Sequence, residues 1–116
     1  MEDDKIQELI DKFIQAAKKH QDSSLANWRM ANLEAKKLQQ IFLELIVGGQ
    51  MAREALLKLV DSEESGVSLM AAVYSLKYNP EKSLKTLKTL EKRPGFIGFQ
   101  AEQAIKRWEE GSWQLE

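Results

Sequence analysis

The sequence lacks cysteine altogether and contains only two prolines and one histidine among 116 residues. Without cysteine the chain can form neither disulfides nor thiolate metal sites. With a single histidine, a transition-metal site would depend mostly on carboxylates. No stretch is rich in proline, glycine or serine, so no linker divides the chain. We therefore expect one domain over residues 1–116, with no metal and no other cofactor.

Neither sign of charge dominates, because the chain has 17 basic and 18 acidic residues and a formal net charge of −1. Such a balance creates no global field that attracts nucleic acid or an anionic membrane. The longest apolar run covers residues 69–74, far fewer than the roughly 20 residues of a membrane span. The acidic start, Met1 to Asp4, lacks the cationic-then-apolar pattern of an export signal. We expect a cytoplasmic protein that does not associate with membranes.

A repeat of thirty residues is the strongest positive signal. Five residues of one segment recur as similar residues thirty positions later: Leu57, Val60, Val67, Ala71 and Tyr78 correspond to Leu87, Leu90, Ile97, Ala101 and Trp108. A period of this size is typical of stacked helix pairs, each unable to bury its apolar face alone. Such stacks form surfaces that bind other macromolecules and rarely carry chemistry.

Apolar residues at steps of three and four predict six helices, and no segment alternates long enough to predict a strand. The expected helices cover about 3–19, from the capping segment 22–24 to 47, 50–60, 62–77, 80–92, and from 96 or 97 to 110. The short connections favour sequential neighbours that pack together. We therefore expect an all-α fold with six helices in three antiparallel pairs.

Several local signals set these bounds. Asn79 is expected to cap the fifth helix, and Pro80 takes its first position. Asp61 and Glu64 have the spacing of a capping box at the start of the fourth helix. Gly111 is expected to end the sixth helix.

Residues 56–61 and those that follow resemble the HEAT-repeat pattern of an apolar first helix, an aspartate at the turn, and a valine followed by paired alanines. The matching residues of the second helix are Val67, Ala71, Ala72 and Leu76. This resemblance implies a HEAT-like α-α superhelix. Ser68 stands where HEAT repeats often carry an arginine, so the aspartate–arginine contact of such turns is absent here.

The chain also resembles a family of small bacterial proteins of uncharacterised function with HEAT-like folds. The matching stretches are 13–17, the region of Asn32, 55–61, 67–74 and 80–90. Some proteins of this kind are encoded beside toxins and look like immunity proteins. The resemblance therefore implies a protein-binding module that neutralises a toxin domain.

Nothing in the sequence indicates catalysis. His20 is expected at a helix end, where its charge would complement the helix dipole. No residue nearby in the sequence supplies the oriented partner and the cleft that a general base needs. The acidic pair Glu63 and Glu64 is adjacent, so its side chains diverge by about a hundred degrees on a helix. We expect a protein without enzymatic activity.

The second helix of each pair lines the concave side of a HEAT-like stack, so we expect a partner protein to contact the second, fourth and sixth helices. The candidate contact residues there are Asn32, Lys36, Leu69, Val73, Phe99, Gln103 and Arg107. The apolar members Leu69, Val73 and Phe99 are equally consistent with an ordinary core. Trp113 follows the last helix, where a cap on the stack and a partner contact are equally consistent.

Two alternatives remain open. Lysines at steps of three and four form a basic ridge on the fifth helix, which Arg93 extends: Lys82, Lys85, Lys88 and Lys92. Such a ridge is typical of a solvated face, and its functional alternative is a nucleic-acid-binding adaptor. The balanced charge and the missing aromatic residues disfavour nucleic acid. The other alternative is a structural helical subunit, either monomeric or homodimeric through the first two helices.

Overall fold

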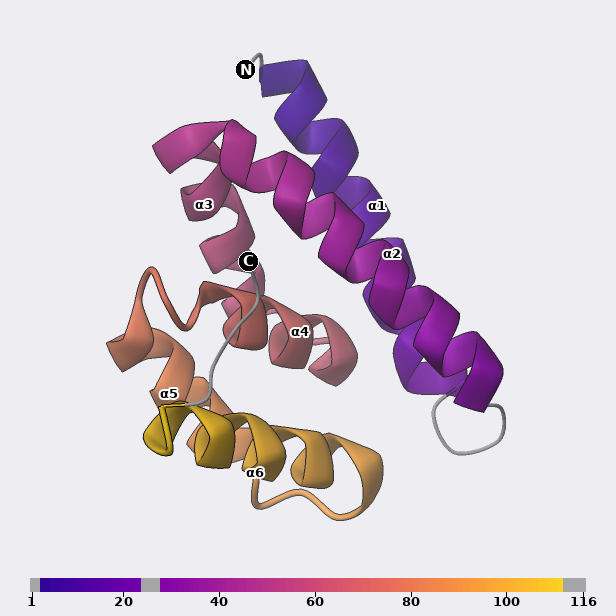
Figure 1. Ribbon diagram of the computed structural model, residues 1–116, viewed down its shortest axis with the longest axis vertical. Helices are drawn as coiled ribbons and strands as arrows, with labels where there is room; N and C mark the ends of the chain where they lie inside the picture. The colour runs from indigo at the N-terminus through magenta and orange to yellow at the C-terminus, as the bar shows by residue number, and fades with distance from the viewer. Residues whose placement is uncertain (1–2, 24–27, 112–116) are drawn as a thin grey trace.

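The computed structural model describes residues 3–23 and 28–111, and over these residues the chain is all-helical without a strand (Figure 1). Its six α-helices are α1 (Asp3–Ser23), α2 (Trp28–Val47), α3 (Gly49–Lys58), α4 (Ser65–Ser75), α5 (Pro80–Leu90) and α6 (Gly95–Glu109), and a 3₁₀ turn, η1 (Leu59–Asp61), follows α3. The predicted all-α fold with six helices is confirmed over the described residues. No helix in this part of the chain is long and apolar enough to cross a membrane.

The two longest helices, α1 and α2, form an antiparallel hairpin (Figure 1). Each has apolar residues at helical spacing along one stripe, and burying these stripes drives the helices together. The buried apolar residues are Ile6, Leu9, Ile10, Phe13, Ala16 and Ala17 on α1 and Ala31, Leu38, Ile41, Phe42 and Leu45 on α2.

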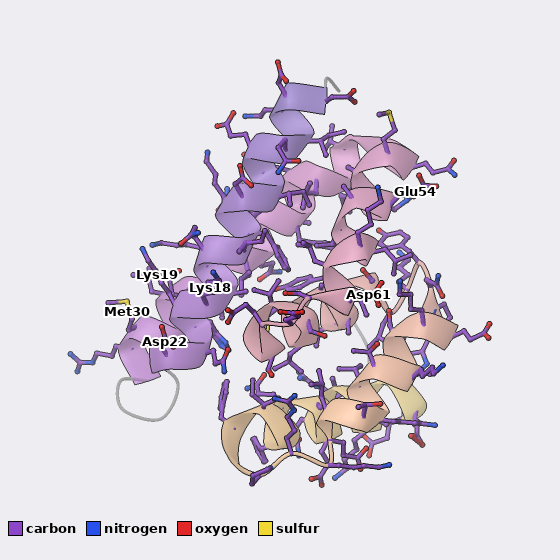
Figure 2. All side chains as sticks on the ribbon, turned by 180° about the vertical axis from the view of Figure 1, so that it is seen from behind. Lys18, Lys19, Asp22, Met30, Glu54 and Asp61 are labelled. Atoms are coloured by element: carbon purple, nitrogen blue, oxygen red, sulfur yellow. The ribbon has the colours of Figure 1, made fainter. Side chains whose placement is uncertain are left out.

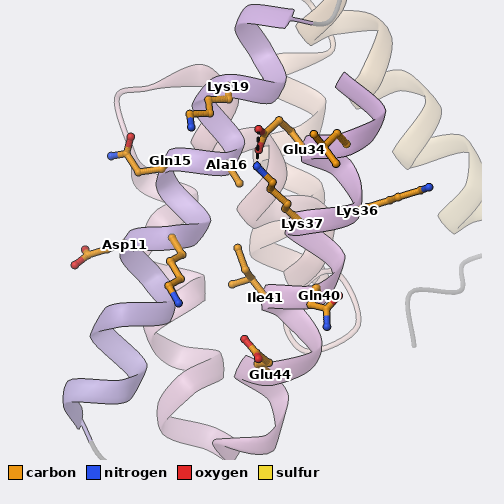
Figure 3. Close-up of a pocket in the computed structure, with 12 residues that line it drawn as sticks. Asp11, Gln15, Ala16, Lys19, Glu34, Lys36, Lys37, Gln40, Ile41 and Glu44 are labelled. Atoms are coloured by element: carbon orange, nitrogen blue, oxygen red, sulfur yellow. Dashed lines mark hydrogen bonds and ion pairs between the residues drawn. The ribbon is translucent and has the colours of Figure 1, made fainter. Parts of the chain in front are cut away.

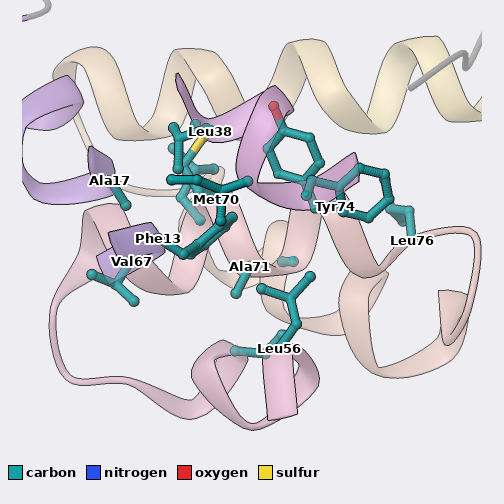
Figure 4. Packing of buried hydrophobic residues seen from close by; sticks show 14 of the residues in the cluster. Phe13, Ala17, Leu38, Leu56, Val67, Met70, Ala71, Tyr74 and Leu76 are labelled. Carbon is teal, nitrogen blue, oxygen red and sulfur yellow. The ribbon is translucent and has the colours of Figure 1, made fainter. Parts of the chain in front are cut away.

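Helix α4 lies at the centre of the structure and contacts α1, α3, α5 and α6. Every residue from Gly66 to Leu76 is buried except Val73, which is partly buried. This segment contains the longest apolar run of the sequence, and a helix that is apolar on all sides is typically a buried one. Figure 4 shows Phe13 of α1, Leu38 of α2 and Leu56 of α3 beside the side chains of α4.

An aromatic cluster joins α4 to both helices of the hairpin. The Tyr74 ring lies edge-on to Phe13, with ring centroids 5.9 Å apart, and packs against Phe42 at 4.9 Å. Burial raises the pKa of Tyr74 to about 12, because the phenolate would lose its hydration there.

The three expected helix pairs are each in contact, but α4 also packs on α5, α6 and α1. The arrangement in pairs and the HEAT-like superhelix therefore stay predictions.

Helix α1 is longer than predicted and ends at Ser23 rather than near residue 19. Asp22 and Ser23, expected to cap the second helix, lie in the last turn of α1; Ser24 lies outside the described residues. The extra turn places His20 against Phe96 of α6, and Gln21 against Gly66 of α4. Packing against two distant helices thus decided where α1 ends.

The predicted capping box at the start of α4 is wrong. Helix α4 begins at Ser65, and its N-cap, Glu64, makes no side-chain capping bond. Instead the Glu64 N–H donates to the hydroxyl oxygen of Ser62 at 3.1 Å. Ser68 donates its own hydroxyl to the buried carbonyl of Val60 at 2.7 Å, which ties η1 to α4. The buried Ser68 side chain therefore stabilises the turn between η1 and α4.

The predicted cap at Asn79 and the predicted helix stop at Gly111 are confirmed. The Asn79 side chain accepts a hydrogen bond from the Lys82 N–H at 3.2 Å, and Pro80 opens α5. Gly111 follows α6 with a φ of 74°, the left-handed conformation expected at a helix stop. Helix α5 ends at Leu90, slightly before the predicted end. Helix α6 begins at Gly95, whose φ of 77° suits glycine.

Gly98 permits the close approach of α6 to the turn before it, because a Cβ there would overlap the backbone carbonyl of Arg93. We predict that Gly98→Ala destabilises the fold by about 1–3 kcal/mol in chemical denaturation, as overpacking does. In an open helix the same change stabilises by roughly 0.5–1 kcal/mol. Gly66→Ala is the matched variant, and it should cost less because the nearest atom ends the flexible Gln21 side chain. A Gly98→Ala protein as stable as the parent would contradict the close approach.

The two helix starts predict opposite responses to alanine. Asn79→Ala removes an observed cap and should lower the free energy of unfolding by about 1 kcal/mol. Glu64→Ala removes a side chain without a capping bond and should change it by less than about 0.5 kcal/mol. Urea denaturation of both variants measures the contrast, and equal losses would show that the capping pattern is assigned wrongly.

Candidate protein-binding surface

Five of the eight predicted contact residues are accessible on α2 and α6. Asn32 and Lys36 are exposed on α2, Phe99 and Arg107 are exposed on α6, and Gln103 is partly buried between the latter two. The two opposite views agree that α2 and α6 lie on one side of the molecule and that α1 and α5 lie on the other (Figures 1 and 2). The five residues are thus accessible on two helices of one side of the molecule, and their role as contacts stays a prediction.

Helix α4 contributes much less to this side than predicted. Leu69 is only 1% exposed and belongs to the core, which was the alternative left open for it in the sequence analysis. Val73 is partly buried and packs against the same core. The physical reason is that α4 is covered by helices on all sides, which the spacing of its own residues does not reveal. Trp113 lies outside the described residues.

The apolar residues on the outer side of α2 were missed by the sequence analysis. Among the described residues, six large apolar side chains are at least 40% exposed: Met30, Leu33, Leu43, Val47, Met51 and Phe99. Five of these six lie on α2 or at the start of α3, and Figure 2 shows Met30 projecting from the end of the hairpin. The signal was present in the sequence, because α2 has apolar residues outside its core stripe.

A groove of about 650 Å³ runs between α1 and α2 on the solvent-exposed side of their hairpin (Figure 3). Its lining combines the buried apolar residues Ala16 and Ile41 with the half-exposed Leu33. The polar lining residues are Asp11, Lys12, Gln15, Lys19, Glu34, Lys36, Lys37, Gln40 and Glu44. Lys36 thus belongs both to this groove and to the predicted contact set.

Glu34 is the unusual residue of the groove, because its carboxylate is buried with a side chain only 2% exposed. The Lys37 ammonium lies 3.2 Å from Oε1, while Oε2 is buried and has no hydrogen-bond partner. In Figure 3 the carboxylate points toward α1 beside Ala16. A buried carboxylate oxygen without a donor carries a substantial desolvation cost. No sequence pattern marks Glu34, since its burial depends on how α1 and α2 pack.

His20 lies at the junction of the hairpin with α6. It is 7% exposed, and its ring centroid lies 5.4 Å from that of Phe96. Burial lowers the pKa of His20 below its ordinary value, and the negative charge of Glu34 opposes this effect in part. His20 does lie in the last turn of α1, as predicted, but a lowered pKa makes the imidazole neutral at pH 7. Its burial against Phe96 adds a packing role, and the charge–dipole role stays a prediction.

Two cations of the basic ridge bind groups of this chain. The Lys82 ammonium lies 2.8 Å from the Asp61 carboxylate, and Arg93 donates to the Ser65 hydroxyl. Lys85, Lys88 and Lys92 are exposed. Two of the five cations of the ridge thus already contact groups of this chain, which leaves fewer of them for a nucleic-acid backbone.

The described residues contain no cluster of three or more potential metal-ligating side chains.

No protein-family model, no curated protein and no solved structure matches the chain. The resemblance to HEAT-like bacterial proteins stays a prediction from the residues.

The buried imidazole predicts a dependence of stability on pH. As the pH falls through about 6.5, the unfolded chain takes up a proton that folded His20 resists, so the free energy of unfolding should decrease. His20→Gln lacks this contribution, and any advantage of the parent at pH 8 should shrink at pH 5. Urea denaturation of both proteins across this range measures the difference. A difference that grows on acidification would show that Glu34 holds the imidazole in its charged form.

Proposed function

We propose that this chain is a non-enzymatic protein-binding module that uses the outer side of α2. The observation that carries the proposal is that α2 has large apolar side chains on both of its faces. One face is buried in the core through Leu38 and Phe42, while Leu33 and Val47 remain 48% and 80% exposed on the other. Large apolar side chains that gather on an exposed surface are typical of a site that another protein covers. We expect another protein to supply the second cover.

The surroundings of α2 fit a specific interface. Polar and charged residues such as Asn32 and Lys36 lie among the exposed apolar side chains. Protein interfaces commonly combine apolar anchors with a polar rim in this way. Phe99 of α6 is another exposed apolar side chain, at 58%. The helices that present these side chains pack against the common core.

The partner that we propose is a bacterial toxin domain, and the chain would neutralise it in the cytoplasm by covering its surface, as an immunity protein does. This step is supported by the resemblance of residues 55–61, 67–74 and 80–90 to small HEAT-like proteins, some of which are encoded beside toxins.

The test uses the protein encoded by the reading frame next to the one that encodes this chain. This neighbouring product, co-expressed with this chain, should form a complex whose dissociation constant can be measured by calorimetry. Leu33→Glu and Val47→Glu should each weaken binding roughly tenfold or more, because a charge would have to be buried at an apolar contact. Both residues are substantially exposed, so the fold should persist, which circular dichroism checks.

The paired change Lys85→Glu and Lys88→Glu is the matched control, since both residues are exposed on α5. It should leave the complex intact. A complex lost only in this control would favour the basic ridge, and the absence of any complex with the neighbouring product would count against the proposal. Light scattering of the isolated chain adds a second check: a dimer that Val47→Glu dissociates and the neighbouring product does not displace would assign the α2 surface to self-association instead.

A further inference from the structure

Helix α2 has a row of exposed side chains along the face that points away from the core. Its members follow one another at steps of three and four, so they share one face of the helix. We call this row the α2 seam, and it consists of Leu33, Lys36, Gln40, Leu43 and Val47. Such steps are typical of a face that a second helix covers.

The α2 seam is complementary to its own reverse about Gln40. Seven residues before and seven residues after Gln40 stand apolar side chains, Leu33 and Val47. Four residues before it stands Lys36, and four residues after it stands Glu44, which has the opposite charge. Four and seven residues are close to whole turns of an α-helix, so all these positions lie near the face of Gln40. A twofold contact between two copies requires this kind of self-complementary surface.

Two copies of α2 that lie antiparallel and cross at Gln40 bring the matching residues together. Leu33 of each copy then faces Val47 of the other copy, and Lys36 of each faces Glu44 of the other. The neutral Gln40 side chains meet at the twofold axis, where two amides can bond each other without a charge. In a parallel arrangement Lys36 would face Lys36 and Glu44 would face Glu44, and like charges repel.

The two charges find no counterpart within one copy. No ion pair of the described residues involves Lys36 or Glu44, while the nearby Lys37 is paired with Glu34. Figure 3 shows Lys36, Gln40 and Glu44 on successive turns of α2. Lys36 and Glu44 are eight residues apart, or roughly 12 Å along the helix axis, which is too far for an ion pair. A second copy supplies the missing opposite charge for both.

The apolar members of the seam favour association, and its length limits the strength of association. Leu33, Leu43 and Val47 are 48%, 41% and 80% exposed, so a cover on α2 removes apolar surface from water. The 20 residues of α2 span only about 30 Å, too little for the large interface of an obligate dimer. On the α1 side of the groove, Asp11 and Lys19 present both signs of charge and so repel neither sign as a whole. We therefore expect a dimer that dissociates readily.

We propose that a second copy of the chain covers the α2 seam while no toxin is bound, antiparallel about a twofold axis at Gln40. The inference rests on the proposed function, because it describes how the same surface is regulated. The toxin and the second copy exclude each other on α2, so one copy leaves when the toxin binds. A dissociable dimer thus keeps the apolar side chains covered until the partner arrives.

Charge reversal in the full chain tests the pairing by sedimentation velocity over a concentration series at low salt. The parent chain should dimerise. Lys36→Glu and Glu44→Lys should each raise the dissociation constant of the dimer about tenfold or more, because each change makes two attractive pairs repulsive. The chain with both changes should recover the dimer. An equimolar mixture of the two single variants should form a dimer with one copy of each, which only a contact between copies can explain.

Two further variants serve as controls. Lys85→Glu changes the net charge as Lys36→Glu does, but it lies exposed on α5 and should leave the dimer unchanged. Leu33→Glu should prevent dimerisation in any charge background, because it places a charge at an apolar contact. Circular dichroism checks that all variants remain folded.

Three results would overturn the inference: a parent chain that stays monomeric at every concentration, single variants that dimerise as the parent does, or a mixture of the two variants that stays monomeric. A neighbouring product that binds the intact dimer would overturn the exclusion between toxin and second copy.

The outcomes also separate this inference from the proposed function. A complex with the neighbouring product and a monomeric free chain removes the second copy alone. A dimer that recovers in the mixture, without any complex with that product, removes the proposed function and keeps the antiparallel contact.

Discussion

The burial of α4 is the constraint on which the rest of the structure depends. This helix has apolar or small side chains on nearly every side, so it needs cover from all directions at once. Helices α1, α3, α5 and α6 supply that cover, and Tyr74 links α4 to both α1 and α2 through Phe13 and Phe42. The Ser68 hydroxyl holds the preceding turn against the same helix. Neither end of the chain can therefore complete its core without this central helix.

The surface of the molecule follows from this arrangement. The α1–α2 hairpin covers α4 with one side, which leaves its other side in solvent. That free side contains the groove with Glu34, which Leu33 of α2 also lines, and Val47 at the end of α2 is exposed as well. The contact between the His20 and Phe96 rings holds the end of α1 against α6. The interface that we propose is thus a consequence of how the hairpin covers the core.

Local signals in the sequence predicted those features that depend on neighbours along the chain. The cap at Asn79 and the stop at Gly111 were correct, because each needs only a few adjacent residues. The capping box at Asp61 and Glu64 failed because a competing bond to Ser62 and an ion pair with Lys82 of α5 took its place. The end of α1 was missed because His20 and Gln21 pack on helices far away in the sequence.

The sequence by itself determined the helical class, the main helix breaks and the placement of Asn32, Lys36, Phe99 and Arg107 on accessible sides, because spacing along one helix fixes which residues share a face. Only the tertiary structure decided that Leu69 is core, that Glu34 is buried with an unpartnered oxygen, and that a groove opens beside it. These features arise where two helices meet, and the register and distance between helices are set by packing around α4, which no single helix encodes.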